Sequence, residues 1–155
     1  MKLLILGDSH GNPGVLKRIV ERERPFDLLI HLGDGAPDLR RVRAAEPFVC
    51  DAVQGNNDPS EVFPEFLALR CNGRRCLFAH GHTFEVHRDL RRLADAGARV
   101  RATMVFFGHT HTPGTWRLGR IRLFNPGSVC SYLTPNPGYL VWEEASDPVW
   151  RRIGA

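Results

Sequence analysis

Four apolar segments of this chain each run directly into residues that can bind a metal ion. The segments are rich in leucine, isoleucine and phenylalanine, and Asp or His follows each of them within a few residues. Because open α/β sheets place ligand sites at the carboxyl ends of their strands, we expect the four junctions to converge. Imidazole and carboxylate groups together indicate a divalent metal site. The four junctions are Asp8-Ser9-His10, His31-Leu32-Gly33-Asp34, His80-Gly81-His82 and His109-Thr110-His111.

The first two junctions each have a second interpretation. Asp8 and His10 are two residues apart, so in an extended chain their side chains would point to one side and could hold one ion. The pair is also compatible with a turn in which Asp8 caps the helix expected after Pro13. Asp34 lies between two glycines, which is ordinary turn chemistry as well. Neither junction establishes a metal site by itself.

The two histidine pairs are more specific. His109-Thr110-His111 follows a wholly apolar strand, where two imidazoles have no packing reason to occur. His80-Gly81-His82 has the same arrangement, and its glycine allows a sharp turn of the backbone. Single histidines are usually structural or lie on the surface, and we place His31 and His87 in that class.

The segment Gly55-Asn56-Asn57-Asp58-Pro59 is predicted to be a loop. Its residue types cluster in turns for conformational reasons, whatever else they do. Any chemical role of this loop must therefore come from the residues that lie next to it in space.

The remaining pattern predicts strands alternating with helices in the first half of the chain, followed by hairpins. Apolar periodicity predicts helices at about 13–23, 37–45 and 86–97. The turn sequences Asn72-Gly73 and Leu118-Gly119-Arg120 each predict a tight connection between two strands. Strands are expected at about 2–7, 27–31, 48–53, 66–70, 74–79, 103–107, 114–118, 120–124 and 138–142.

Parallel units followed by hairpins favour an α/β (α+β) fold with two packed, mostly mixed sheets flanked by helices. The length of 155 residues fits one domain covering residues 1–155, and no repeat or linker divides it. The four cysteines form no CxxC pair, so reduced thiols and a cytoplasmic location are expected. The few apolar residues before Asp8 are too short for a signal peptide or a membrane span, so we expect no membrane partner.

The net charge of +4 does not predict a specific nucleic-acid partner. The arginines are spread along the chain with acidic residues among them. The densest group, Arg88, Arg91 and Arg92, lies beside Asp89 in a predicted amphipathic helix, which favours a solvated face. Oligomeric state is not predicted.

Taken together, the ordered motifs resemble one known family. Asp-x-His, Gly-Asp, Gly-Asn, His-Gly-His and Gly-His-x-His occur in that order, each after a strand or in a glycine-containing loop. This chain resembles the calcineurin-like metallophosphoesterases, in their small single-domain phosphodiesterase branch (YfcE-like). The resemblance runs from Lys2 to about Trp142 and includes the loop Asn125-Pro126-Gly127-Ser128.

The resemblance implies two divalent ions, bridged by Asp34 and by a hydroxide that attacks the phosphorus of a phosphate ester. Asp34 and Asn56 would belong to the catalytic centre. This set of nitrogen and oxygen ligands suits manganese, which we expect first, or iron, zinc, cobalt or nickel. The implied ligands are Asp8, His10 and His111 for the first ion, Asn56, His80 and His109 for the second, and Asp34 for both.

Asn57 departs from the pattern of many relatives, which carry a histidine there that can protonate the leaving alkoxide. An asparagine cannot do so, and a positioned acid typically contributes about 10²–10⁴-fold. We therefore expect a preference for esters with good leaving groups. His82 is a candidate substitute acid, and Asp58 is expected to orient a neighbouring ligand.

The short connections leave no room for a cap domain over the site. Only 21 residues separate Asp34 from Asn56, and 26 separate His82 from His109. An open site suits a small phosphodiester substrate whose second substituent points into solvent. A phosphomonoesterase or nucleotide pyrophosphatase is the alternative, and a non-catalytic interaction scaffold of the same fold is a third hypothesis.

Overall fold

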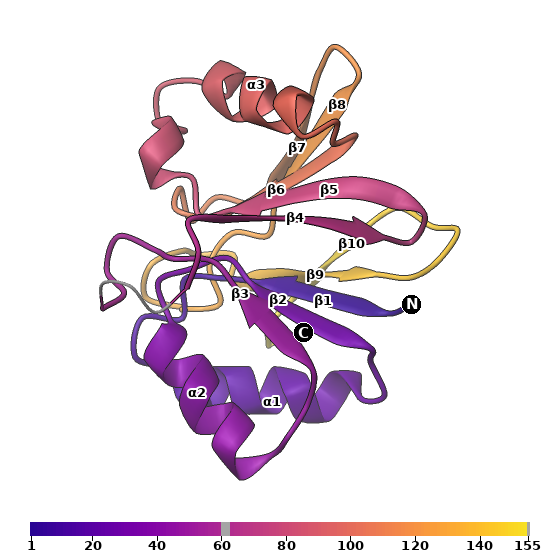
Figure 1. Cartoon of the computed structure of the whole chain (residues 1–155). Helices are drawn as coiled ribbons and strands as arrows, with labels where there is room; N and C mark the ends of the chain where they lie inside the picture. The colour runs from indigo at the N-terminus through magenta and orange to yellow at the C-terminus, as the bar shows by residue number, and fades with distance from the viewer. Residues whose placement is uncertain (60–62, 155) are drawn as a thin grey trace.

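The computed structural model describes residues 1–59 and 63–154, which form two five-stranded β-sheets packed face to face, with helices on the outer faces (Figure 1). The mixed two-sheet architecture expected from the sequence is confirmed. Among the described residues, no helix is long and apolar enough to cross a membrane. The elements in chain order are β1 (Leu3–Leu6), α1 (Pro13–Glu23), β2 (Leu28–His31), α2 (Ala36–Ala45), β3 (Cys50–Ala52), β4 (Phe66–Cys71), β5 (Arg74–Ala79), the 3-10 helix η1 (His82–Phe84), α3 (Arg91–Arg99), β6 (Met104–Phe107), β7 (Gly114–Leu118), β8 (Ile121–Asn125), β9 (Gly138–Trp142) and β10 (Val149–Arg152).

The first sheet has the strand order β10-β9-β1-β2-β3. Strands β1, β2 and β3 are parallel, as the alternation of strands and helices predicts, while β9 and β10 are added in antiparallel pairing. Helices α1 and α2 cover the outer face of this sheet (Figure 1). All four residues of β1 are buried, which explains why this strand is apolar throughout rather than alternating.

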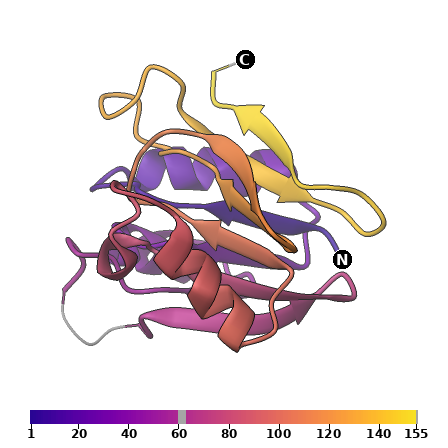
Figure 2. The same cartoon turned by 90° about the horizontal axis from the view of Figure 1, so that it is seen from above.

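The second sheet has the order β4-β5-β6-β8-β7 and is covered by α3. Seen from above, α3 lies in front of this sheet (Figure 2). Both predicted hairpins are present. Asn72 and Gly73 take positive φ angles of 47° and 76° between β4 and β5, and Gly119 has a φ of 57° between β7 and β8.

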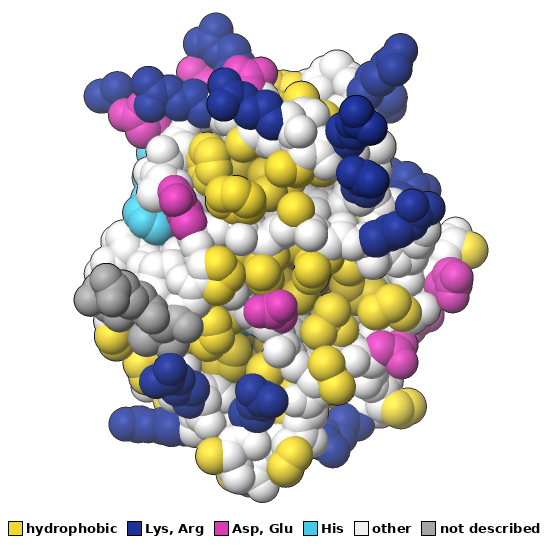
Figure 3. Space-filling model, viewed as in Figure 1, with side chains coloured by type: hydrophobic (Ala, Val, Ile, Leu, Met, Phe, Trp, Pro, Cys, Tyr) yellow, Lys and Arg dark blue, Asp and Glu magenta, His cyan; other side chains and the backbone are white. Residues whose placement is uncertain are grey.

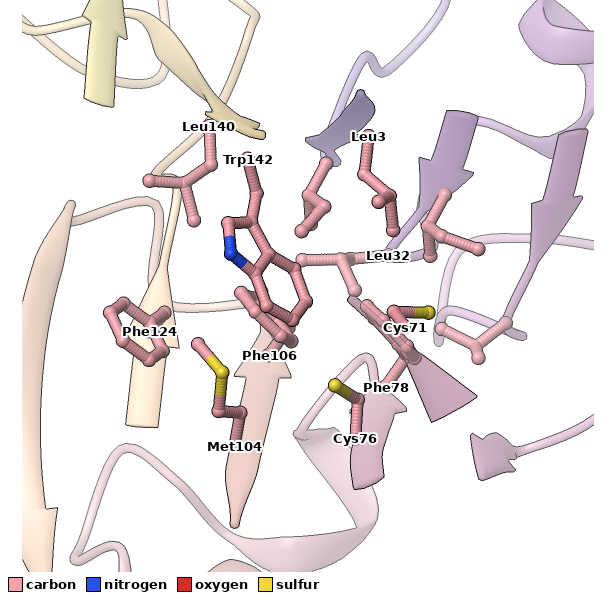
Figure 4. Packing of buried hydrophobic residues seen from close by; sticks show 13 residues of the cluster. Leu3, Leu32, Cys71, Cys76, Phe78, Met104, Phe106, Phe124, Leu140 and Trp142 are labelled. Carbon is pink, nitrogen blue, oxygen red and sulfur yellow. The ribbon is translucent and has the colours of Figure 1, made fainter. Parts of the chain in front are cut away.

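Aromatic, aliphatic and sulfur-containing side chains fill the space between the two sheets (Figure 4). Phe106 stacks on Phe78 with ring centroids 5.0 Å apart and on Phe124 at 5.2 Å. Trp142 of the first sheet contacts Phe106 of the second with centroids 5.7 Å apart. This packing fixes the position of β6 relative to β1, and therefore the positions of the loops that follow them.

Two sequence predictions differ from the structure. The predicted helix 86–97 begins only at Arg91, since residues 85–88 form a turn after η1 and Leu90 is the N-cap of α3. Strand β10 was not predicted. Its residues are mostly polar or partly exposed, and it becomes a strand only by pairing with β9 at the sheet edge. Such pairing is a non-local interaction without a strong local signal.

Candidate metal centre

The loops that follow β1, β2, β5 and β6 meet at one edge of the sandwich, on the left of Figure 1. Histidine side chains reach the surface on the same side of the molecule (Figure 3). The convergence predicted from the sequence is therefore present. Two groups of side chains there have ligand atoms within 4.8 Å of one another, namely Asp8, His10 and His111, and Asp8, Asp34 and His80.

The first group surrounds a carboxylate oxygen that lacks a hydrogen bond. Asp8 Oδ1 lies 3.3 Å from His111 Nε2 and 3.9 Å from His10 Nε2. Asp8 is completely buried, and within the described part of the chain neither its Oδ1 nor His10 Nε2 has a hydrogen-bond partner. Leaving such groups unpaired is costly, so their common orientation fits a cation held between them.

The second group is built around His80. Its Nδ1 donates to the carbonyl oxygen of Leu32 at 2.8 Å, which leaves Nε2 directed at Asp34 Oδ2 (3.5 Å) and Asn56 Oδ1 (3.1 Å). This is the usual arrangement of a metal-binding histidine, in which a backbone acceptor fixes the tautomer and the ring orientation. The donor set therefore fits a divalent ion as well as the first group does.

His109 lies beside this second group. Its ring centroid is 4.9 Å from that of His80, and its backbone N–H donates to Asp8 Oδ2 at 3.2 Å. The structure thus brings all seven predicted ligand residues to one edge of the fold, with His109 and the amide of Asn56 at its margin.

Most of the predicted ligands have a left-handed backbone, which non-glycine residues adopt rarely. The sequence interpretation assumed extended chain at Asp8 and His10, and this is wrong. Asp8 is not a helix cap either, since Asn12 is the N-cap of α1. Strained conformations of this kind concentrate at functional sites. The residues concerned have φ between 45° and 68° and are Asp8, His10, Asp34, His109 and His111.

Two glycines allow the loops to approach the carboxylates. A Cβ on Gly55 would collide with the backbone N and a carboxylate oxygen of Asp34. A Cβ on Gly108 would lie 2.6 Å from Asp8 Oδ2. Any larger residue at either position would displace the carboxylate that it faces.

Two further aspartates hold the loops in place. Asp58 accepts hydrogen bonds from the backbone N–H groups of Asp34, Gly35 and Ala36, all at 2.8 Å, so it orients the loop that carries Asp34. Asp38 was not predicted from the sequence. Its Oδ2 accepts from Ser9 Oγ at 2.7 Å and from the backbone N–H groups of residues 11 and 12, which encloses the turn around His10. The sequence signal that could have pointed to Asp38 is a carboxylate in the first turn of α2. Such a carboxylate is also a common helix stabiliser, so the signal is not specific.

The loop after β8 supports the site from the other side. Ser128 Oγ donates to the carbonyl oxygen of Asp8 at 2.7 Å. The Asn125 amide donates to the carbonyl oxygen of Gly108 and to Thr110 Oγ1, both at 3.0 Å. The resemblance to the family included this loop but gave it no role. In the structure its side chains hold the chain at Asp8 and at residues 108–110, just before His111, so they support two ligands of the first group.

The pKa values of the site reflect its two buried carboxylates. Burial would raise the pKa of Asp34, but the hydrogen bond and charge of His80 outweigh it, and this pKa lies well below its usual range. Burial would lower the pKa of His80, but the contact with Asp34 and the charge of Asp8 raise it overall. Burial and the charge of His80 lower the pKa of His109 to about 4. The carboxylate is thus ionised, and the pair of buried aspartates attracts positive charge to this edge.

The remaining histidines lie at different distances from the centre. His31 is buried and accepts a hydrogen bond from Gly33 N at 3.2 Å, in agreement with a structural role. His82 lies 5.2 Å from His80 between ring centroids, with a pKa lowered by burial and by the charge of His80. His87 is exposed, as expected, but its ring contacts that of His109 at 4.5 Å, which the sequence did not predict.

The motifs and the geometry agree with comparisons to known proteins. Residues 1–147 match the model of the calcineurin-like phosphoesterase superfamily domain. The chain belongs to this superfamily. The resemblance inferred from the motifs is therefore confirmed, and the chain is a member of a family of metal-dependent phosphoesterases.

Individual relatives extend this comparison. The chain is 35% identical over 130 residues to the probable metallophosphoesterase YsnB of Bacillus subtilis, covering 83% of this chain and 75% of that protein. It is 23% identical over 155 residues to the phosphodiesterase MJ0936 of Methanocaldococcus jannaschii, covering 88% and 89%. Among solved structures, Vps29 of Entamoeba histolytica complexed with Zn²⁺ shares the fold, with a TM-score of 0.76, 20% identity and coverage of 99% and 98%.

Proposed function

We propose that this chain is a phosphodiesterase with a dinuclear metal centre, acting on small phosphate esters. The observation that carries the proposal is the position of Asp34 Oδ2, which lies 3.5 Å from His10 Nε2 on one side and 3.5 Å from His80 Nε2 on the other. One carboxylate oxygen thus faces both ligand groups. Asp8, His10 and His111 would hold one ion, Asn56, His80 and His109 the other, and Asp34 would be shared.

Two ions bound there would supply a hydroxide nucleophile and a clamp for two phosphoryl oxygens. The chain itself holds the ligands in their binding orientation before any ion arrives. Leu32 fixes the tautomer of His80, and Asp58 fixes the backbone of Asp34. This nitrogen and oxygen set without sulfur does not itself select among the transition metals. Metal availability then decides which ion is bound, and on that ground we propose manganese as the first candidate.

The identity of the loop residue Asn57 favours a diester with a good leaving group over a monoester. Asn57 has no proton to give to a leaving alkoxide, so we propose a preference for good leaving groups. His82 remains a candidate acid, although its lowered pKa means that little of it is protonated at neutral pH.

We also propose that residues 1–155 form one domain and that it works in the cytoplasm, where the four free cysteines would stay reduced.

The deciding experiment is a hydrolysis panel with bis(p-nitrophenyl) phosphate and p-nitrophenyl phosphate, after removal of metal and addition of Mn²⁺, Fe²⁺, Zn²⁺, Co²⁺ or Ni²⁺ in turn. We expect diester turnover that EDTA abolishes and that Asp34→Ala lacks. Circular dichroism of the variant controls for folding. Faster monoester turnover would favour a phosphomonoesterase, and no turnover with any metal would favour an interaction scaffold.

A further inference from the structure

Asn57 binds both carboxylate oxygens of Asp34. Its side-chain Nδ2 donates to Asp34 Oδ2 at 2.7 Å, and its backbone N–H donates to Asp34 Oδ1 at 2.8 Å. No other residue in the described ranges makes two hydrogen bonds to this carboxylate. The carboxylate is therefore fixed in both rotation and position by a single residue.

The contact is part of a two-way connection between loops. The next residue, Asp58, accepts three hydrogen bonds from the loop that carries Asp34. The 55–58 loop thus donates to the Asp34 carboxylate through Asn57 and accepts from the backbone around it through Asp58. Gly55 permits this close approach, because a Cβ there would collide with Asp34. Backbone and side chain of Asp34 are held by adjacent residues.

We propose that Asn57 is a positioning residue that fixes the Asp34 carboxylate so that its Oδ2 faces both ligand groups; this inference rests on the proposed dinuclear function. An amide is uncharged over the whole working pH range, so it holds the carboxylate without adding a cation that competes with the metal. A carboxylate offers about two acceptor sites on each oxygen, so each oxygen of Asp34 can accept its hydrogen bond from Asn57 and keep one site for an ion. Asn57 cannot act as a general acid, and its proposed role at this position is to orient the Asp34 carboxylate.

Calorimetric titration of the metal-free protein with Mn²⁺, repeated with Zn²⁺, tests this role without reference to activity. Loss of a partner that orients a ligand typically lowers metal affinity about 10–100-fold, and we expect a loss in this range for Asn57→Ala. Asn57→Asp keeps the size of the side chain but replaces the Nδ2 donor by a second carboxylate. The side-chain hydrogen bond to Asp34 Oδ2 is therefore lost in this variant too, while the backbone N–H of residue 57 can still donate to Oδ1. Asn136→Ala is the matched control, since this exposed asparagine contacts none of the proposed ligands through any hydrogen bond in the described residues.

Three readouts separate positioning from a merely structural role. Metal-free thermal unfolding must show that Asn57→Ala folds cooperatively, while its metal affinity falls and its kcat for the diester falls more than its KM rises. Metal affinities of both Asn57 variants within threefold of the wild type would overturn the proposal. If the wild type binds metal but cleaves no ester, the proposed function fails and the calorimetry still decides the role of Asn57. If the wild type binds neither metal, both proposals are overturned.

Discussion

Two buried carboxylates lie at opposite ends of β1 and are compensated in different ways. Glu23, near the beginning of the strand, accepts hydrogen bonds from the Tyr139 hydroxyl at 2.6 Å and from Arg151 at 2.8 Å, and Lys2 Nζ lies 3.1 Å away. Asp8, just after the end of the strand, has one oxygen without a hydrogen bond and faces imidazoles. Their side chains are about equally buried, at 1% and 0% exposed.

The difference lies in the partners. Lys and Arg carry permanent charge at neutral pH, so the Glu23 cluster is complete with its own residues. An imidazole, unlike Lys or Arg, can give up its proton near neutral pH and then offer a nitrogen ligand. A buried carboxylate with permanently cationic partners stabilises the fold, whereas one surrounded by imidazoles can exchange their protons for a metal ion. Each prediction below tests one side of this comparison.

The largest expected effect is on catalysis, from Asp8→Asn. This change keeps the shape but removes the anionic charge from the first ligand group. Because the metal-supplied hydroxide depends on the bound ions, we expect diesterase activity to fall at least ~10⁴-fold. The measurement is kcat/KM with bis(p-nitrophenyl) phosphate in saturating Mn²⁺. Residual activity above one hundredth of the wild type would mean that Asp8 is not essential for binding the metal.

Glu23→Ala should affect stability and leave the chemistry intact. It leaves Lys2, Tyr139 and Arg151 without their common partner, and breaking a buried ion pair typically costs about 3–5 kcal/mol. We expect a loss near the lower end, because Lys2 and Arg151 can still reach water. Urea denaturation measures the free energy of unfolding. An equal loss of activity per folded molecule would contradict the separation of the two clusters.

Metal should stabilise only through the Asp8 end of the strand. At a Mn²⁺ concentration of 100 Kd, binding adds about 2.7 kcal/mol to the free energy of unfolding, or roughly 5–10 °C in Tm for a domain of this size. We expect this shift in the wild type and in Glu23→Gln, and a smaller shift in Asp8→Asn, which keeps only the second ligand group intact. Differential scanning calorimetry with and without EDTA makes the comparison.

The smallest effect is a pH dependence at Glu23. Burial would raise its pKa, but the Tyr139 hydroxyl and the charges of Lys2 and Arg151 outweigh it, so the folded pKa lies below the ordinary value of 4.5. The ionised Glu23 therefore stabilises the fold above pH 4.5, and this contribution is lost as the pH falls through the folded pKa. At pH 7 we expect Glu23→Gln to cost about 1.5–3 kcal/mol, the worth of hydrogen bonds to a charged group. In urea melts, this difference from the wild type should shrink at acid pH; a constant difference would contradict the ionic origin.

The sequence by itself determined the inventory of the site and much of the framework. Apolar strands ending in His and Asp were predictable because strand propensity and metal-ligand chemistry are properties of short segments. The parallel β1-β2-β3 unit and both hairpins followed from periodicity and turn residues for the same reason. Membership of the family was also readable, because its motifs occur in order along the chain.

Only the tertiary structure decided how those residues act together. The left-handed backbone of Asp8 and His10, the support from Asp38, the approach of His87 to His109 and the pairing of Asn57 with Asp34 all depend on loops distant in sequence. Strand β10 likewise exists only through its pairing with β9. Local chemistry determines which groups a chain offers, while non-local packing determines which groups face one another. For this protein, non-local packing places Asp34 Oδ2 between His10 and His80, where it faces both groups of candidate ligands.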